Sequence, residues 1–86
     1  MTFNDLEFKD LPSLNGIQVM VKFKNNYGAS VVKHDSSYGG KNGLYELAVI
    51  KDDNLCYDTP VTSDVEGYLS EDDVTELLKQ IQELKS

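Results

Sequence analysis

The sequence predicts an α+β fold, an antiparallel β-meander of three to five strands with one C-terminal amphipathic helix packed on one face. Apolar and polar residues alternate strictly from Ile17. Apolar residues recur three and four positions apart after Ser70. Short clusters of asparagine, aspartate and glycine break the segment between them. A period of two is typical of a half-buried strand, the longer period of an amphipathic helix, and the clusters of turns. With 86 residues, the chain is expected to form one domain.

Residues 1–15 are predicted to form an N-terminal extension or a short edge strand. Leu6 and Phe8 alternate with charged neighbours as they would in a strand, and the segment from Pro12 to Gly16 has the composition of a turn. The antiparallel sheet is assigned to residues 16–58. The apolar face of its first strand consists of Ile17, Val19, Val21 and Phe23.

Three further strands are expected in this sheet. The second covers roughly Ala29 to His34, and its two adjacent valines would face opposite sides, so the sequence leaves its register open. The third, Leu44 to Lys51, is apolar on both sides, which indicates a central position. The fourth, Leu55 to Tyr57, ends before Pro60, because proline has no N–H to donate to a ladder. As an edge strand it could pair across a two-fold axis in a homodimer.

A glycine-rich loop, Asp35 to Gly43, joins the second and third strands. Its three glycines are expected to take the positive φ that a tight reversal requires. Such loops can also hold phosphate through backbone N–H groups. However, this loop lacks the Lys-Ser or Lys-Thr pair and the following helix of nucleotide hydrolases, which favours a structural turn. The candidate ligand-binding residues are His34, Ser37, Tyr38, Gly39, Gly40 and Lys41.

Residues 59–69 are predicted as a linker and residues 70–85 as the helix. Ser70 is the expected N-cap, and the three acidic residues that follow it suit the positive end of the helix dipole. The apolar stripe of the helix should cover the dry face of the strand that begins at Ile17. This stripe consists of Val74, Leu77, Leu78, Ile81 and Leu84.

Charge and cysteine content restrict the classes of function. The net charge is −7, and residues 52–86 carry ten acidic residues against two lysines. The chain contains no arginine, which, with this charge, argues against direct nucleic-acid binding. One cysteine excludes an internal disulfide and indicates a reducing compartment. Neither a signal peptide nor a membrane-length apolar run is present, so we expect a cytoplasmic protein that makes no membrane contact.

No enzymatic activity, cofactor or metal site is predicted. His34 lies beside Asp35 and two serines, but sequence neighbours in a strand point to opposite faces and therefore do not form a triad. A single histidine with scattered acidic residues lacks the spaced ligands that zinc requires. Cys56 lies between apolar residues, where core packing is its expected role.

The acidic C-terminal half is the candidate protein-binding surface. Its charge complements a basic surface on a partner, and tyrosine is enriched where proteins bind one another. Of the five tyrosines, Tyr38 at the tip of the loop is expected to be exposed. The alternative interpretation is a solubilising helix face. The candidate protein-binding residues are Asp64, Glu66, Glu71, Asp72, Asp73, Glu76 and Tyr38.

Five short motifs of the chain resemble those of a group of small proteins encoded by tailed bacteriophages. The motifs span Tyr27–Val32, Ser37–Gly40, Gly43–Val49, Tyr57–Pro60 and Gly67–Val74. The resemblance brings no assigned activity or functional residue with it. It implies a phage accessory protein made in the bacterial host cytoplasm.

This setting favours a non-enzymatic protein that binds and inhibits or redirects a host protein through its acidic surface. The partner would be a host defence or nucleic-acid-processing factor with a basic surface. The alternative is a protein that sequesters a small molecule or nucleotide with the glycine-rich loop.

Overall fold

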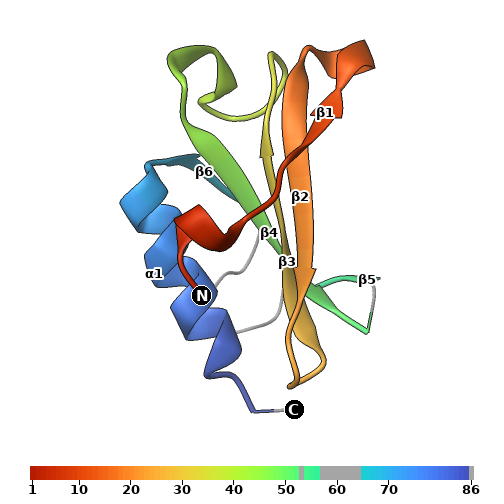
Figure 1. Ribbon diagram of the computed structural model, residues 1–86, viewed down its shortest axis with the longest axis vertical. Helices are drawn as coiled ribbons and strands as arrows, with labels where there is room; N and C mark the ends of the chain where they lie inside the picture. The colour runs from red at the N-terminus through yellow and green to blue at the C-terminus, as the bar shows by residue number, and fades with distance from the viewer. Residues whose placement is uncertain (53, 57–64, 86) are drawn as a thin grey trace.

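An antiparallel sheet with one helix across one of its faces confirms the predicted α+β class (Figure 1). The computed structural model describes residues 1–52, 54–56 and 65–85. The strands are β1 (Lys9–Leu11), β2 (Gly16–Lys22), β3 (Tyr27–Lys33), β4 (Tyr45–Lys51), β5 (Asn54–Leu55) and β6 (Glu66–Leu69), and the helix is α1 (Glu71–Gln82). Three short 3-10 turns complete the secondary structure, namely η1 (Phe3–Asp5), η2 (Pro12–Leu14) and η3 (Gly40–Asn42).

The six-stranded sheet is a meander from β1 to β5 to which β6 returns. β5 and β6 pair with different ends of the same edge of β4. β5 lies opposite Ile50 and Lys51, whereas β6 lies opposite Tyr45 and Leu47. The structure thus places a strand at the end of the segment predicted as a linker. The earlier part of that segment, with Tyr57 of the predicted fourth strand, lies outside the described residues.

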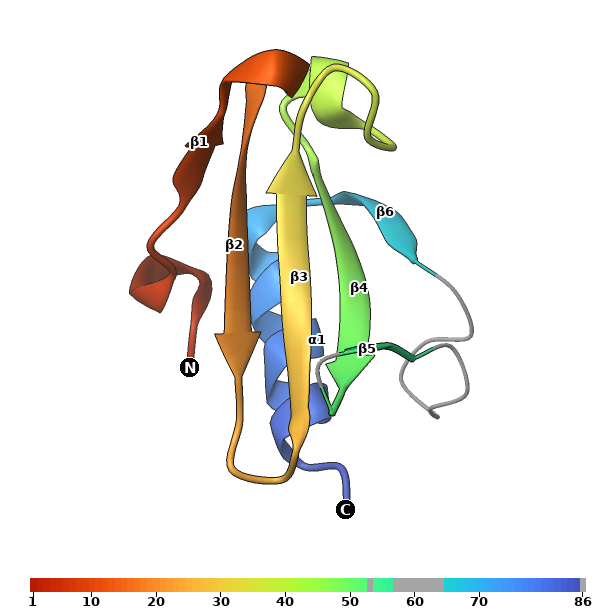
Figure 2. The same ribbon diagram turned by 90° about the vertical axis from the view of Figure 1, so that its right-hand side faces the viewer.

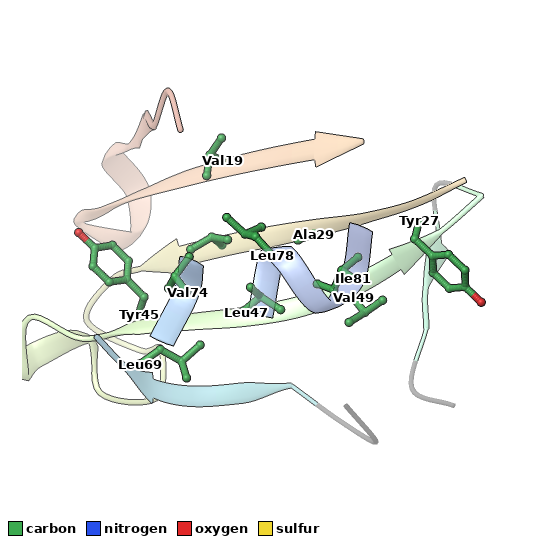
Figure 3. Packing of buried hydrophobic residues seen from close by; sticks show 11 residues of the cluster. Val19, Tyr27, Ala29, Tyr45, Leu47, Val49, Leu69, Val74, Leu78 and Ile81 are labelled. Carbon is green, nitrogen blue, oxygen red and sulfur yellow. The ribbon is translucent and has the colours of Figure 1, made fainter. Parts of the chain in front are cut away.

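The core lies between the sheet and α1. Val74, Leu78 and Ile81 of the predicted helical stripe are fully buried, and Leu77 and Leu84 are partly buried beside them. Figure 3 shows that Val74, Leu78 and Ile81 meet side chains of β3 and β4, including Leu47. The helix was expected to cover β2, but it lies chiefly against β3 and β4, the central strands (Figure 2).

The N-terminal segment covers the part of this face that α1 leaves open. The ring of Phe3 packs edge-on against Tyr45 with centroids 5.0 Å apart, and the ring of Phe8 lies 5.7 Å from the same tyrosine. The backbone N–H of Phe3 donates to Oγ1 of Thr75 at 2.8 Å, which joins this segment to α1. β1 then follows as a short edge strand opposite Gly16–Gln18. Residues 1–15 therefore contain both the predicted N-terminal extension and the predicted edge strand.

Strand pairing also determines the register of β3. Val31 pairs with Val19 and Leu47 and is fully buried beneath α1. Val32 points to the opposite face, where Met20 of the neighbouring strand is 62% exposed. Period-two alternation therefore holds in β3, but only the neighbouring strands identify its buried valine.

The turn between β2 and β3 caps the far end of α1. Nδ2 of Asn25 donates to the backbone carbonyls of Ile81 at 2.9 Å and Leu84 at 2.8 Å, and its Oδ1 accepts from the N–H of Tyr27 at 3.1 Å. The last carbonyls of a helix have no partner within the helix. This turn therefore stabilises both the hairpin and the helix C-terminus.

Candidate protein-binding surface

The loop between β3 and β4 lies at one end of the molecule, and β6 and the start of α1 lie in the same half (Figure 1). The fold thus brings Tyr38 close to acidic residues that lie about 30 positions later in the chain. Of the predicted protein-binding residues, Tyr38, Glu66, Glu71, Asp72, Asp73 and Glu76 are exposed. Asp64 lies outside the described residues.

Two tyrosines form the aromatic part of this end. Tyr38 is 59% exposed and Tyr68 is 62% exposed. The backbone N–H of Tyr68 donates to the carbonyl of Tyr38 at 3.2 Å. Each side chain also lies against the glycine beside the other tyrosine. A Cβ on Gly67 would overlap Cβ of Tyr38, and a Cβ on Gly39 would lie 3.0 Å from Cδ1 of Tyr68. We call these two residues the tyrosine pair.

A β-bulge directs Tyr68 outwards. Tyr45 pairs with Leu69 and Leu47 with Glu66, so two residues of β6 oppose Glu46 alone. Tyr68 has a φ of 57°, in the left-handed region. This region costs an ordinary residue about 1–2 kcal/mol, and bulges commonly re-aim a side chain. From the sequence, Tyr38 was the one tyrosine expected to be exposed. The signal that could have indicated an exposed Tyr68 was Gly67, the glycine directly before it.

The outward side of α1 carries three acidic residues and one lysine, Lys79. Asp72, Glu76 and Glu83 are spaced by four and seven residues, which places them opposite the buried stripe. We call these three residues the acidic ridge. Asp73 has a structural role instead, because its carboxylate accepts from the N–H of Ser70 at 3.0 Å while Oγ of Ser70 accepts from the N–H of Asp73 at 3.1 Å. This capping box confirms Ser70 as the N-cap.

The acidic residues of β6 and of the start of α1 outnumber the cations at this end, where the exposed lysine is Lys41 of the glycine-rich loop. The sequence contains no lysine, arginine or histidine between Lys51 and Lys79. Within the part of the chain that the structure describes, Glu66, Glu71 and Asp72 have no cationic side chain as a partner. Exposed carboxylates without a counter-charge produce a local negative potential.

The glycine-rich loop uses its own polar groups internally. Oγ of Ser37 accepts from the N–H of His34 at 3.0 Å and donates to the carbonyl of His34 at 2.9 Å. The loop N–H groups that donate to loop carbonyls are those of Ser37, Gly40, Asn42, Gly43 and Leu44. These bonds occupy donors that a phosphate would require, and they give the loop the geometry of a closed structural turn.

The prediction that all three loop glycines have a positive φ is wrong for Gly40. Gly39 and Gly43 have the expected positive φ, of 83° and 77°. Gly40 does not have a positive φ. It is required for a different reason, because a Cβ at this position would overlap the carbonyl oxygen of His34.

His34 and Asp35 have separate hydrogen-bond partners. Nδ1 of His34 accepts from the N–H of Ser36 at 3.1 Å. Oδ2 of Asp35 accepts a hydrogen bond from Nδ2 of Asn15 at 3.2 Å. Lys41 is exposed on η3. These contacts do not assemble a catalytic relay.

Within residues 1–52, 54–56 and 65–85, no three His, Cys, Asp or Glu side chains gather closely enough to hold a metal ion. None of the helices described there has the length and apolarity needed to cross a bilayer. Lys22 pairs in register with Gly28 on the outer face of the sheet, whereas Lys33 lies over Tyr45 on the helical face. These lysines therefore do not form one basic patch.

Comparison with known proteins gave no match to a family model, a curated protein or a solved structure. The candidate surface is therefore defined by its own geometry and charge.

Proposed function

We propose that this protein is a non-enzymatic binding module that attaches to a basic surface of a partner protein. The contacting surface is formed by the tyrosine pair, β6 and the acidic ridge, which runs from the start of α1 to its far end. The observation that carries this proposal is the set of exposed carboxylates without a cationic partner in the described chain. Such charges cost little while they are solvated and interact favourably when a cationic surface approaches.

The geometry favours recognition of a surface over catalysis. Carboxylates of the acidic ridge follow one side of a rigid helix, so their spacing is fixed before the partner arrives. Complementary charge mainly accelerates association and selects the partner, and the tyrosine side chains supply contact area at a low entropic cost. A rigid acidic helix beside aromatic rings is suited to covering a groove that normally binds a polyanion.

The resemblance to phage proteins supplies the biological setting of the proposal. In this setting the partner is a bacterial host protein, such as a defence or nucleic-acid-processing factor. Covering its basic surface would inhibit or redirect it.

Affinity capture from bacterial lysate tests the proposal with two charge-matched variants. In the first, Asp72→Lys and Glu76→Lys reverse the acidic ridge while Asp73 keeps its capping role. In the second, Glu7→Lys and Asp10→Lys make the same charge change at the opposite edge of the sheet. Capture is compared at about 0.05 M and 0.5 M salt, where screening lengths differ roughly threefold.

We expect a specific protein to bind the wild type and the edge variant at low salt. It should be lost from the ridge variant and from every sample at high salt. Equal loss of capture from the two variants would show that net charge alone is responsible and would refute a specific acidic surface. Equal retention of capture would refute it as well. Circular dichroism of both variants checks that each retains the fold.

A further inference from the structure

The rings of Tyr38 and Tyr68 are the exposed aromatic groups at the acidic end, and their placement indicates what they contact. Both are more than half exposed although they pack on each other's neighbouring glycines. The tyrosine side chains therefore fill the space beside Gly39 and Gly67. A larger residue at either glycine would collide with them. This packing fixes the base of each side chain and leaves much of each residue accessible.

Two buried tyrosines of the sheet, Tyr27 and Tyr45, show that a tyrosine ring of this protein can receive a lysine. Nζ of Lys51 lies 5.3 Å from the ring centroid of Tyr27, and Nζ of Lys33 lies 5.1 Å from that of Tyr45. A cation at this distance is attracted by the negative face of the ring. Two tyrosines of the sheet are thus paired with lysines of the chain itself.

The tyrosine pair lacks such a cation. Among the residues described by the structure, no lysine lies over Tyr38 or Tyr68. On the side of β6 and α1, Tyr68 is flanked in sequence by Glu66 and Glu71. Tyr68 therefore lies among acidic residues of β6 and α1, whereas the loop of Tyr38 also carries the exposed Lys41.

We propose that the tyrosine pair receives an arginine or lysine side chain of the partner protein. The ring faces attract the cation, and the carboxylates beside β6 and along the acidic ridge attract neighbouring basic residues. The inference rests on the proposed function, because it identifies the group on the basic partner surface that the tyrosines recognise. It assigns Tyr68 as a specificity-determining residue, held outwards by the bulge and its left-handed backbone.

Peptide binding followed by NMR and tyrosine fluorescence tests this assignment. The probes are an octapeptide of alternating glycine and arginine and a matched peptide with citrulline in place of arginine. Citrulline preserves the shape and removes the positive charge. The protein contains no tryptophan, so its intrinsic fluorescence arises from tyrosine alone.

Three variants separate the aromatic contribution from the electrostatic one. Tyr68→Asn removes the ring and keeps a residue type that tolerates left-handed geometry. Tyr68→Phe keeps the ring face and removes the hydroxyl. The variant with Asp72→Lys and Glu76→Lys removes charge and leaves both rings in place.

We expect the arginine peptide to shift the amide resonances of Tyr38, Gly39, Gly67 and Tyr68, and the citrulline peptide to leave them unchanged. Tyr68→Asn should weaken binding about fivefold, whereas Tyr68→Phe should remain within about twofold of the wild type.

Two results would overturn the inference and leave the proposed function standing. One is binding by Tyr68→Asn at wild-type affinity while the ridge variant loses binding. The other is equal shifts with the citrulline peptide. Wild-type affinity in the ridge variant would instead contradict the proposed function. An absence of shifts up to about 1 mM arginine peptide would overturn the inference, because even a weak cation site responds at this concentration.

Discussion

Replacing Asn25 with alanine should weaken the whole domain, although the residue lies in a turn. Its side-chain amide donates to the carbonyls of Ile81 and Leu84 at the end of α1, at 2.9 and 2.8 Å. Its oxygen also accepts from the N–H of Tyr27. Alanine would leave the helix carbonyls to water and would remove one bond that shapes the turn.

The expected loss follows from these bonds. Each contributes about 0.5–1.5 kcal/mol net, so the two helix-directed bonds together contribute about 2 kcal/mol. For a domain of this size, 1 kcal/mol corresponds to about 4–8 °C in Tm. Asn25→Ala should therefore lower Tm by about 8–16 °C.

Thermal unfolding by far-UV circular dichroism measures this change, with two accompanying variants. Asn25→Asp keeps the oxygen that accepts from Tyr27 but places a negative charge beside the negative end of the helix dipole, so it should be less stable than Asn25→Ala. Asn26→Gly alters the same turn at a residue with a φ of 69°, and should remain within about 0.5 kcal/mol of the wild type. A Tm for Asn25→Ala within about 2 °C of the wild type would refute the cap.

Three further changes test the loop, the helix start and the N-terminal segment by chemical unfolding. Gly40→Val should lower the free energy of unfolding by more than about 2 kcal/mol, because the new Cβ would overlap a carbonyl oxygen. Gly43→Ala should lower it by about 1 kcal/mol, because the site has open space and only the left-handed backbone is unfavourable. Asp73→Ala should cost about 1 kcal/mol by loss of the capping box, and Asp72→Ala close to none. Phe3→Ala should cost about 2 kcal/mol because its ring packs on the core.

Each of these comparisons has a contrary outcome. Equal losses at Gly40 and Gly43 would indicate that the loop relaxes around a side chain. Equal effects at Asp72 and Asp73 would assign the helix start to general charge rather than to a cap. A neutral Phe3→Ala would show that the N-terminal segment adds no stability to the core.

The elements with strong local signals could be predicted from the sequence. The alternation from Ile17 identified β2, and the spacing of Val74, Leu78 and Ile81 identified the buried face of α1. Ser70 was recognised because a cap depends on residues only three positions apart. In each case the determining interactions lie within one element.

Features that depend on contacts between distant segments could not be predicted. The strand β6 has four residues and a bulge, so it shows no period of two. Exposure of Tyr68 depends on a loop about 30 residues earlier, where Gly39 gives its side chain room. Likewise, the requirement for Gly40 arises from a carbonyl brought close by the fold rather than from its own φ.

The division of the β4 edge between β5 and β6 limits how this sheet can grow. A strand from another molecule needs a continuous row of unpaired N–H and C=O groups, and the two short strands already pair with both ends of β4. At the other side of the sheet, β1 offers only three residues and exposes Lys9 and Asp10. Edge-to-edge polymerisation would thus gain few hydrogen bonds and would bring charged residues together. We expect this architecture to resist fibrillar aggregation at high protein concentration.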